Sequence, residues 1–296
     1  MKSTSKSNIV VLGPTASGKT AYAISLAKQL NGAIISADSR QVYAGMNIGT
    51  AKPQEAFSDI PHSPATPDII YGVPHYLLTI ASSNSSYTLS DWLRDAAIAL
   101  EEIKKSKKIP IITGGTMLYI DALVDGYDVP NIEPNPELRK ALEQQSPEIL
   151  YKKLQELDPV ACTFIEPHNT RRIIRALEVI DATGEKFSDL RRASASRHNA
   201  TRIGIFPGWD SMKINIESRS HAMLRQGLVH EAVALREKYP ASPLLATINY
   251  KEALQVADGV CAQEEAAAKM SQATLRYAHR QMSWWNRRSD IGWICV

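Results

Sequence analysis

Cysteine is scarce in this sequence and long apolar runs are missing, and these absences exclude several classes of protein. Cys162, Cys261 and Cys295 lie far apart and no two of them have CxxC spacing, so we expect neither a disulfide framework nor a structural zinc site. No apolar run approaches the roughly 18 residues that a membrane span needs. The N-terminus is short, polar and basic, and no long apolar core follows it, which argues against a signal peptide. We therefore expect a cytoplasmic protein without membrane contact.

What the sequence does contain is the composition of an ordinary globular protein. Its 296 residues are enough for one large α/β domain and a smaller one. Hydrophobic residues make up 44% of the chain and charged residues 22%, so a buried core is expected. The formal net charge of +3 permits an anionic partner but does not require one.

Apolar runs alternate with helical patterns in the first part of the chain. The runs at 8–12, 33–37 and 109–112 are typical of buried parallel strands. The apolar spacing at 18–30 and 92–105 predicts helices. This alternation predicts an α/β fold with a parallel sheet that is covered by helices on both faces.

The pattern changes after about Asp125, where prolines mark a linker, and helical patterns then dominate to about residue 190. Residues 202–206 have the character of a strand that returns to the sheet, and helices follow. Residues 47–71 are polar and carry four prolines, which favours a long surface loop. We therefore predict two domains, namely a catalytic core of residues 1–125 and 203–296 and a helical insertion of residues 126–202.

The strongest motif follows the first predicted strand and opens the first predicted helix. It fits GxxxxGK[ST] in full and in the context that a P-loop requires. The glycines let backbone N–H groups turn towards an anion, and the helix N-terminus adds the positive end of its dipole. Lys19 supplies a charge to the terminal phosphates, and the Thr20 hydroxyl can bind Mg²⁺. The predicted phosphate-binding residues are Gly13, Pro14, Thr15, Ala16, Ser17, Gly18, Lys19 and Thr20.

Two polar residues follow the other predicted strands. Asp38 closes the second strand, and Thr116 comes after the third strand and a pair of glycines. Ligands of open α/β sheets lie beyond the carboxyl ends of the strands, so both residues are expected at the phosphate site. Asp38 could be a base, a metal ligand or a helix cap. The third strand ends in Thr113, where a P-loop kinase or ATPase usually has an Asp for Mg²⁺, and this argues against routine ATP hydrolysis.

Two segments carry clustered arginines. In residues 171–175, two arginines lie at i and i+4 on one helical face with a third beside them, and residues 276–288 mix arginines with aromatic residues and no acid. Arginine contacts phosphates and aromatic rings stack on unpaired bases, so both segments could bind RNA. A solvated basic face and, for the aromatic residues, a place in the core are the alternatives. The candidate RNA-binding residues here are Arg171, Arg172, Arg175, Arg276, Arg280 and Trp284.

Taken in order, these motifs resemble the tRNA dimethylallyltransferase family, also called tRNA isopentenyltransferase. Residues 13–20 match its GPTASGKT, residues 38–53 resemble DSRQVYxGMDIGTAKP, and residues 172–179 are similar to RIxRALEV. The similarity continues nearly end to end, through residues 72–77, 114–119, 227–228, 250–252 and 276–284. The combination in one chain is far more specific than the P-loop alone.

The resemblance implies a P-loop NTPase-like sheet with an inserted all-helical tRNA-binding domain. It also implies transfer of a dimethylallyl group from dimethylallyl diphosphate to the exocyclic amine of the adenosine on the 3′ side of the anticodon. The zinc finger of eukaryotic members is absent, which suits a bacterial-type enzyme. The expected partners are tRNA, through its anticodon stem-loop, and dimethylallyl diphosphate, the expected cofactor is Mg²⁺, and we expect a monomer.

The resemblance also implies roles for single residues. Lys19 and a Mg²⁺ ion on Thr20 would hold the diphosphate and stabilise its departure. Asp38 would accept the proton of the amine, and Thr116 would orient the reactants by hydrogen bonding. The further residues implied in tRNA binding are Asp38, Ser39, Arg40, Gln41 and Thr116.

The sequence departs from the family pattern at several positions. Asn47 stands where the family usually has Asp, and Asn249 where it has Gly. No departure touches the phosphate-binding residues, Asp38 or Thr116. Three alternatives stay open: an adenylate isopentenyltransferase that acts on a free nucleotide, a small-molecule P-loop kinase, and a non-catalytic RNA-binding protein. The first alternative would not need the two basic segments.

Overall fold

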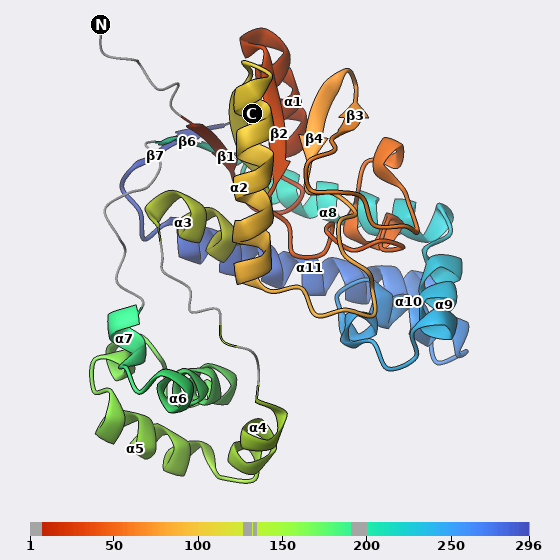
Figure 1. Ribbon diagram of the computed structural model, residues 1–296. Coiled ribbons are helices and arrows are strands. Elements are labelled where there is room, and N and C mark those ends of the chain that lie inside the picture. Colours follow the sequence, from red (N-terminus) through yellow and green to blue (C-terminus); the bar gives the residue numbers. More distant parts are fainter. Residues whose placement is uncertain (1–7, 127–131, 133–134, 191–199, 296) are drawn as a thin grey trace, which may run out of the picture. The chain divides into compact units, whose positions relative to one another are not determined.

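The computed structural model describes residues 8–126, 132, 135–190 and 200–295 (Figure 1). Its contacts group the chain into two compact units, which are residues 1–120 with 198–296, and residues 121–197. Each unit is described by itself below. The functional domain limits drawn from the sequence, after residues 125 and 202, stay a prediction.

The first unit contains a sheet with seven strands in the described residues, in the order β3-β4-β2-β5-β1-β6-β7. All neighbouring strands run parallel except β3, which is antiparallel to β4. This confirms the predicted α/β fold and the return of residues 202–206 to the sheet. The strands are β1 (Asn8–Leu12), β2 (Gly32–Ser36), β3 (Asp68–Ile70), β4 (Val73–Tyr76), β5 (Ile109–Thr113), β6 (Ala200–Ile205) and β7 (Ile291–Ile294).

Helices supply most of the remaining described residues, and none of them is both long enough and apolar enough to cross a membrane. In the first unit they are α1 (Lys19–Leu30), α2 (Leu89–Lys105), the start of α3 (Met117–Asp125), α8 (Trp209–Arg225), α9 (Leu228–Lys238), α10 (Tyr250–Ala257) and α11 (Gln263–Trp285), with short 3₁₀ turns η1 (Ile48–Thr50), η2 (Gln54–Ala56) and η4 (Pro243–Ala246). In the second unit they are α4 (Pro136–Glu143), α5 (Pro147–Leu157), η3 (Ala161–Thr163), α6 (Thr170–Thr183) and α7 (Phe187–Leu190).

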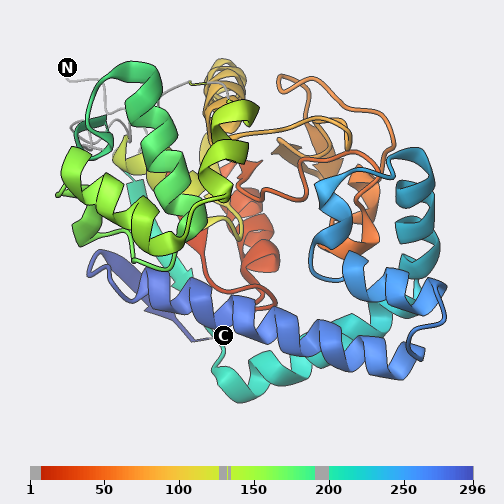
Figure 2. The same ribbon diagram turned by 90° about the horizontal axis from the view of Figure 1, so that it is seen from below.

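The central strands are buried on both faces, which is why their sequences are continuous apolar runs. Val11 and Ile34 pack with Ala27 of α1 on one face. Successive side chains of a strand point to opposite faces, so the equally buried Val10 and Ile35 belong to the other face. Helix α2 contacts β2 and β5 and lies over that other face (Figures 1 and 2).

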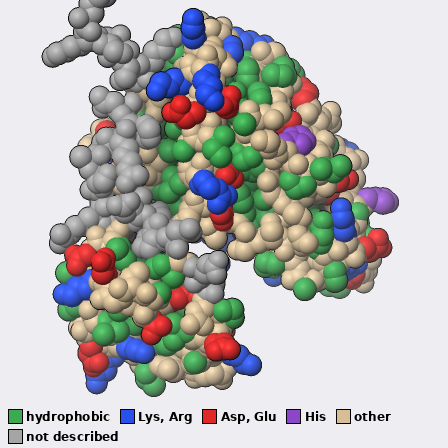
Figure 3. Space-filling model, in the orientation of Figure 1, with side chains coloured by type: hydrophobic (Ala, Val, Ile, Leu, Met, Phe, Trp, Pro, Cys, Tyr) green, Lys and Arg blue, Asp and Glu red, His purple; other side chains and the backbone are tan. Residues whose placement is uncertain are grey.

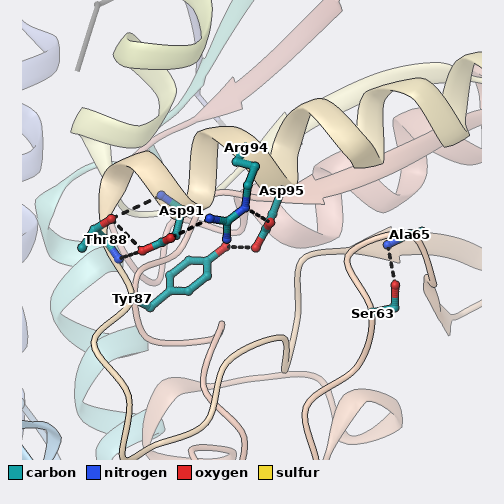
Figure 4. Close-up of polar contacts among 7 residues, drawn as sticks. All are labelled: Ser63, Ala65, Tyr87, Thr88, Asp91, Arg94 and Asp95. Carbon is teal, nitrogen blue, oxygen red and sulfur yellow. Dashed lines mark hydrogen bonds and ion pairs between the residues drawn. The ribbon is translucent and has the colours of Figure 1, made fainter. Parts of the chain in front are cut away.

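A polar cluster fixes where α2 begins (Figure 4). The Thr88 side chain accepts a hydrogen bond from the Asp91 N–H, and the Asp91 carboxylate accepts one from the Thr88 N–H, which forms a capping box. Arg94 pairs with Asp91 and with the buried Asp95. Tyr87 donates its hydroxyl proton to Asp95 at 2.8 Å. The cluster satisfies the first N–H groups of the helix and the buried carboxylate together.

The capped helix brings Trp92 to the end of β2. The Trp92 side chain is fully buried, and its Nε1–H donates to the Ser36 carbonyl at 3.1 Å. Its ring stacks on Tyr119 of α3 with 4.7 Å between the ring centroids. This packing supports the chain segments that leave β2 and β5, where the predicted site residues follow.

The C-terminal part of the chain completes the first unit. Helix α11 lies alongside α8 (Figure 2). The chain then forms β7, which pairs with β6 at the sheet edge. The sequence reasoning missed β7, as it missed β3 and β4, because each is a run of three or four residues that has little periodicity to detect.

The prediction of a long surface loop at 47–71 is correct for most of the segment, which is irregular and largely accessible, but incomplete. This segment contains η1, η2 and strand β3, and it buries the charged end of Lys52. The Lys52 amine donates to the Tyr43 carbonyl at 2.8 Å and to the Thr79 hydroxyl at 2.7 Å. Polar composition did not reveal that Lys52 is satisfied inside the protein instead of by water.

The second unit has a core of its own. Leu150 and Leu154 of α5 pack with Ile173 and Leu177 of α6, and all four side chains are buried. Asn135 caps α4 by accepting from the Leu138 N–H at 3.0 Å, and Pro136 follows it at the first helical position. These signals explain why the helical character of this segment could be predicted from the sequence.

Candidate active site

The P-loop motif, residues 13–20, joins β1 to α1, and this is where the anion cradle is predicted. Gly13 and Gly18 both have positive φ, at 148° and 87°, in the region that favours glycine. A Cβ on Gly13 would overlap the Ile205 carbonyl of β6, so only glycine fits there. Such a loop at the start of a helix can present backbone N–H groups to an anion, and the dipole of α1 also favours one.

Lys19 begins α1, and its side chain turns back over the loop. Its Nζ donates to the Pro14 carbonyl at 3.3 Å. Burial lowers the pKa of Lys19 to about 8, while the charge of Asp38 raises this pKa and the charge of Arg219 lowers it. A bound anion would favour the protonated form. The charge of Lys19 is therefore only partly stabilised by the protein itself, and its contact with the terminal phosphates remains a prediction.

A second cation reaches the P-loop from α8. The Arg219 guanidinium donates to the Thr15 hydroxyl at 2.9 Å, and burial lowers its pKa to about 10 while Asp38 raises it. One turn earlier, the Asn215 amide donates to the Ala16 carbonyl at 3.2 Å. The sequence analysis missed both residues, and their i, i+4 spacing on one helix was the one signal available.

Asp38 uses its two carboxylate oxygens differently. Oδ1 accepts from the N–H groups of Arg40 and Gln41 at 2.8 and 3.2 Å, and so caps the turn that follows β2. Oδ2 faces Gly115, where a Cβ would lie 3.5 Å from it. Of the three roles expected for Asp38, that of a cap therefore describes Oδ1. The role of a base or metal ligand remains a prediction for Oδ2.

Thr116 belongs to the loop after β5, which is fastened to the segment after β2. The Thr116 hydroxyl accepts from the Ser39 N–H at 2.9 Å, and the Thr116 N–H donates to the Ala37 carbonyl at 3.0 Å. A Cβ on Gly114 would overlap Ala37, so the close approach requires glycine. The structure thus brings Asp38, Ser39 and Thr116 together at the carboxyl edge of the sheet. Their catalytic and RNA-binding roles remain predictions.

Helix α11 closes the site from its buried side. Gln281, which is fully buried, accepts from the Thr15 N–H at 2.8 Å and donates to the Gly115 carbonyl at 2.8 Å. The Tyr277 hydroxyl donates to the same carbonyl at 2.8 Å. The sequence analysis assigned neither residue to the site, because helical spacing alone does not say which polar residue faces inwards.

One arginine of the segment 171–175, in the second unit, stabilises the fold. Glu178 is 1% exposed and accepts from Arg175 at 2.6 Å, from two guanidinium nitrogens of Arg139 at 2.8 and 2.9 Å, and from the Asn135 N–H at 2.8 Å. Burial raises the pKa of Glu178, but these donors outweigh it and hold the pKa at about 2. Arg175 therefore has a structural partner, and RNA contact by Arg175 remains a prediction.

The other predicted RNA-binding residues lie on accessible faces. Arg171 and Arg172 are exposed on α6, and Arg276 and Arg280 are exposed on α11, while Trp284 is half-buried. On the face shown in Figure 3, acidic and basic side chains of the described residues are interspersed. Exposure permits contact with RNA, but it does not separate this role from a solvated basic face.

Several of the segments that resemble the family meet at the carboxylate of Glu231, which the sequence analysis missed. Glu231 of α9 accepts from the Tyr250 hydroxyl at 2.6 Å. It also accepts from three consecutive backbone N–H groups at the start of η1, namely those of Asn47, Ile48 and Gly49, at 3.2, 2.8 and 3.1 Å. A Cβ on Gly49 would overlap the Tyr250 ring. Glu231 therefore links α9, α10 and η1.

The two departures from the family pattern named above, Asn47 and Asn249, lie in this same region. Asn249 has a φ of 78°, where glycine is favoured and Asn is among the better tolerated residues. Its amide donates to the Gly49 carbonyl at 2.8 Å. Asn47 offers its side-chain oxygen to the Lys52 amine at 3.3 Å. Burial lowers the pKa of Lys52 to about 8, and the charge of Glu231 raises it.

Comparison with known proteins gives concordant matches. The family described as IPP transferase matches residues 41–288, and the one described as Isopentenyl transferase matches residues 7–58. The tRNA dimethylallyltransferase of Thermomicrobium roseum is 37% identical over 294 residues, which cover 97% of this chain and 86% of the relative. That of Anoxybacillus flavithermus is 35% identical over 289 residues, which cover 97% and 89%.

Solved structures are similar along nearly the whole chain. The full-length tRNA isopentenylpyrophosphate transferase of Bacillus halodurans has a TM-score of 0.67 at 34% identity, and the match covers 98% of this chain and 90% of that protein. A eukaryotic dimethylallyltransferase acting on tRNA has a TM-score of 0.78 at 25% identity, with 98% and 74% covered.

Proposed function

Because this chain belongs to the IPP transferase family, we propose that it transfers a dimethylallyl group from dimethylallyl diphosphate to an adenosine of tRNA. The acceptor is the exocyclic amine of the adenosine on the 3′ side of the anticodon, and the leaving group is pyrophosphate. One observation carries the proposal beyond family membership. The P-loop cradle and the turn that holds Asp38 and Thr116 are fastened into one site by Gln281.

The leaving group is held by charge and by backbone N–H groups. The amine nitrogen attacks the allylic carbon, the carbon–oxygen bond breaks, and the electron pair leaves with the diphosphate. Negative charge therefore grows on the diphosphate in the transition state, where Lys19 and Arg219 are placed beside the cradle. Cations in a fixed and partly desolvated position stabilise such charge more than water does.

The acceptor needs a base because the adenine amine is a poor nucleophile. Its lone pair is delocalised into the ring, and nitrogen loses a proton as the new bond forms. Oδ2 of Asp38 is the carboxylate oxygen that does not cap the turn, and we assign the proton to it. Thr116, which accepts from Ser39 beside it, would orient the amine.

Magnesium fits the site as an ion bound largely by the substrate. Among the described residues, no group of three or more His, Cys, Asp or Glu side chains could hold a metal. The Thr20 hydroxyl at the start of α1 is the P-loop ligand, and diphosphate oxygens and water would complete an octahedral shell, as Mg²⁺ prefers. When bound, the ion would neutralise charge on the departing diphosphate. The choice of Mg²⁺ over another divalent metal is part of the proposal.

The RNA contacts are also part of the proposal. We assign the anticodon stem-loop to Ser39, Arg40 and Gln41 at the site and to the exposed arginines of α6 and α11. The anticodon loop presents unpaired bases, so the target adenosine can leave its stack at a modest free-energy cost. We further propose that the protein acts as a monomer in the cytoplasm.

Prenylation of a synthetic RNA tests the proposal. Purified protein should modify an unmodified anticodon stem-loop with dimethylallyl diphosphate and Mg²⁺ in the absence of ATP, and it should release one pyrophosphate per modified adenosine. Nucleoside mass spectrometry identifies the product, and a stem-loop with guanosine at the target position is the matched control. A preference for free AMP over the stem-loop would indicate an adenylate isopentenyltransferase, and a requirement for ATP hydrolysis would indicate a kinase.

A further inference from the structure

Gln281 lies between two parts of the site that come from different segments of the chain. Its side chain on α11 is fully buried. The amide oxygen accepts from the Thr15 N–H of the P-loop at 2.8 Å, and the amide nitrogen donates to the Gly115 carbonyl at 2.8 Å. One planar group therefore spans the phosphate cradle and the loop next to Asp38 and Thr116.

The chemistry of the two partners dictates which side chain can make this link. The Thr15 N–H can only donate and the Gly115 carbonyl can only accept. The linking group must therefore accept on one side and donate on the other. Glutamine does both, whereas an ionised glutamate of the same shape has no donor and a methionine of similar length has neither group. The amide at position 281 meets this requirement.

The Gly115 carbonyl is held by two donors from the same helix. Tyr277 also donates to this carbonyl at 2.8 Å, and burial, followed by the charge of Asp38, raises the pKa of Tyr277, which keeps its hydroxyl protonated. A Cβ on Gly115 would lie 3.0 Å from Nε2 of Gln281 and 3.5 Å from Oδ2 of Asp38. Only a glycine backbone separates the Gln281 amide from the carboxylate.

We propose that Gln281 is a positioning residue that sets the geometry between the diphosphate cradle and the Asp38 carboxylate. It touches neither substrate, and acts by holding Thr15 and Gly115 in place. Displacement of a reacting group by about 1 Å can lower a rate by roughly 10²-fold. The inference rests on the proposed function, because it takes the cradle to hold the leaving group and Asp38 to be the base.

The test compares substitutions that remove one or both hydrogen bonds. Gln281→Met removes both and Gln281→Glu removes the donor, and each should lower kcat for stem-loop prenylation by roughly 10–100-fold. KM for the stem-loop should stay within about three-fold, because Gln281 contacts no RNA. Tyr277→Phe should lower kcat only a few-fold, since Gln281 still donates to Gly115. Gln272→Met, at an exposed position of the same helix, is the matched control and should leave kcat unchanged.

A binding measurement separates this inference from the proposed function. Calorimetric titration of the free protein with pyrophosphate and Mg²⁺ needs neither RNA nor chemistry, and Gln281→Met should weaken binding while Gln272→Met should not. A wild-type protein that binds pyrophosphate but prenylates nothing would refute the proposed function and leave the role of Gln281 in the cradle standing. Wild-type kcat and pyrophosphate affinity in Gln281→Met, or a loss confined to the melting temperature, would overturn the inference.

Discussion

The two units of this molecule use cationic side chains in opposite ways. At the P-loop, Lys19 and Arg219 donate to a carbonyl and a hydroxyl, and burial lowers the pKa of each. In the helical unit, Arg139 and Arg175 both pair with a buried carboxylate, Glu178, and hold its pKa at about 2. The first pair lacks a carboxylate at hydrogen-bond distance among the described residues, whereas the second pair is part of the fold.

This difference shows what a cluster of cations means for function. A buried cation that lacks a protein anion is less stable than one in water, and a bound anion relieves that instability. An arginine that pairs with a buried carboxylate already has a protein anion that stabilises its charge. The P-loop unit is therefore prepared for an external anion, and Arg139 and Arg175 are held by an internal one.

Removal of the Lys19 charge should have the largest effect on the rate of prenylation. Lys19→Ala should lower the single-turnover rate of prenylation by at least ~10³-fold, because the leaving diphosphate loses a fixed positive charge. Arg139→Ala, which removes a cation of the second kind, should leave the rate within a few-fold. Rates come from rapid quench with saturating stem-loop, and circular dichroism checks the fold. Equal losses of rate in Lys19→Ala and Arg139→Ala would contradict the difference between the two units.

Two substitutions of Asp38 can separate the predicted roles of its two carboxylate oxygens. Asp38→Asn keeps an oxygen that can accept from Arg40 and Gln41, so the turn should persist, but it removes the base. We expect the chemical step to fall by roughly 10²–10⁴-fold while the affinity for tRNA stays within a few-fold. Asp38→Ala, which also removes the cap, should lose stability in addition. A normal single-turnover rate in Asp38→Asn would remove Asp38 from the role of base.

Loss of Glu178 should affect the fold of the helical unit and leave the chemistry intact. Glu178→Gln removes the buried charge that pairs with Arg139 and Arg175 and should destabilise this unit, by less than the about 3–5 kcal/mol of a fully buried ion pair, because both arginine side chains are partly exposed to water. The folded pKa of about 2 lies below the ordinary value of 4.5, so this stabilisation is complete above about pH 4.5 and is lost as pH falls towards 2. Hydrogen exchange of residues 135–190 as a function of pH measures both effects. Unchanged protection in Glu178→Gln would contradict the internal role of these arginines.

Salt dependence should separate the exposed arginines from Arg175, which donates to Glu178. If Arg171, Arg172, Arg276 and Arg280 contact phosphates, each Arg→Ala should reduce the slope of log affinity against log salt by up to roughly one. Arg175→Ala should instead lower the stability of the helical unit, because Glu178 loses a partner. Fluorescence anisotropy with a labelled stem-loop measures the slopes. Slopes that all four variants leave unchanged would favour the solvated-face alternative.

The sequence was most informative where local chemistry determines the structure. The P-loop could be predicted because Gly13 and Gly18 adopt backbone angles that favour glycine, and because a strand and a helix flank them. Asp38 and Thr116 could be expected at the same edge, since parallel strands end together. The family resemblance also implies that these residues act in one active site. Their roles in catalysis remain predictions.

The sequence was least informative where a role depends on contacts between distant segments. Arg219 and Gln281 reach Thr15 from positions 204 and 266 residues away along the chain, and neither stands in a pattern that indicates a phosphate site. Arg175 stands in an arginine cluster, yet its guanidinium is turned to Glu178. Polar residues on a helix have the same spacing whether they face water, a carboxylate or the P-loop, and only the packing decides.

The central claim is that the P-loop serves an allylic diphosphate instead of ATP, and a calorimetric titration of the free protein tests it most directly. Dimethylallyl diphosphate with Mg²⁺ should bind to the wild type and fail to bind to Lys19→Ala. A roughly tenfold excess of ATP should leave the apparent dissociation constant of dimethylallyl diphosphate within about a factor of two. Binding should weaken as pH rises through about 8, because Lys19 then loses its proton. Tight binding of ATP that displaces dimethylallyl diphosphate, or affinity that Lys19→Ala leaves intact, would contradict the account.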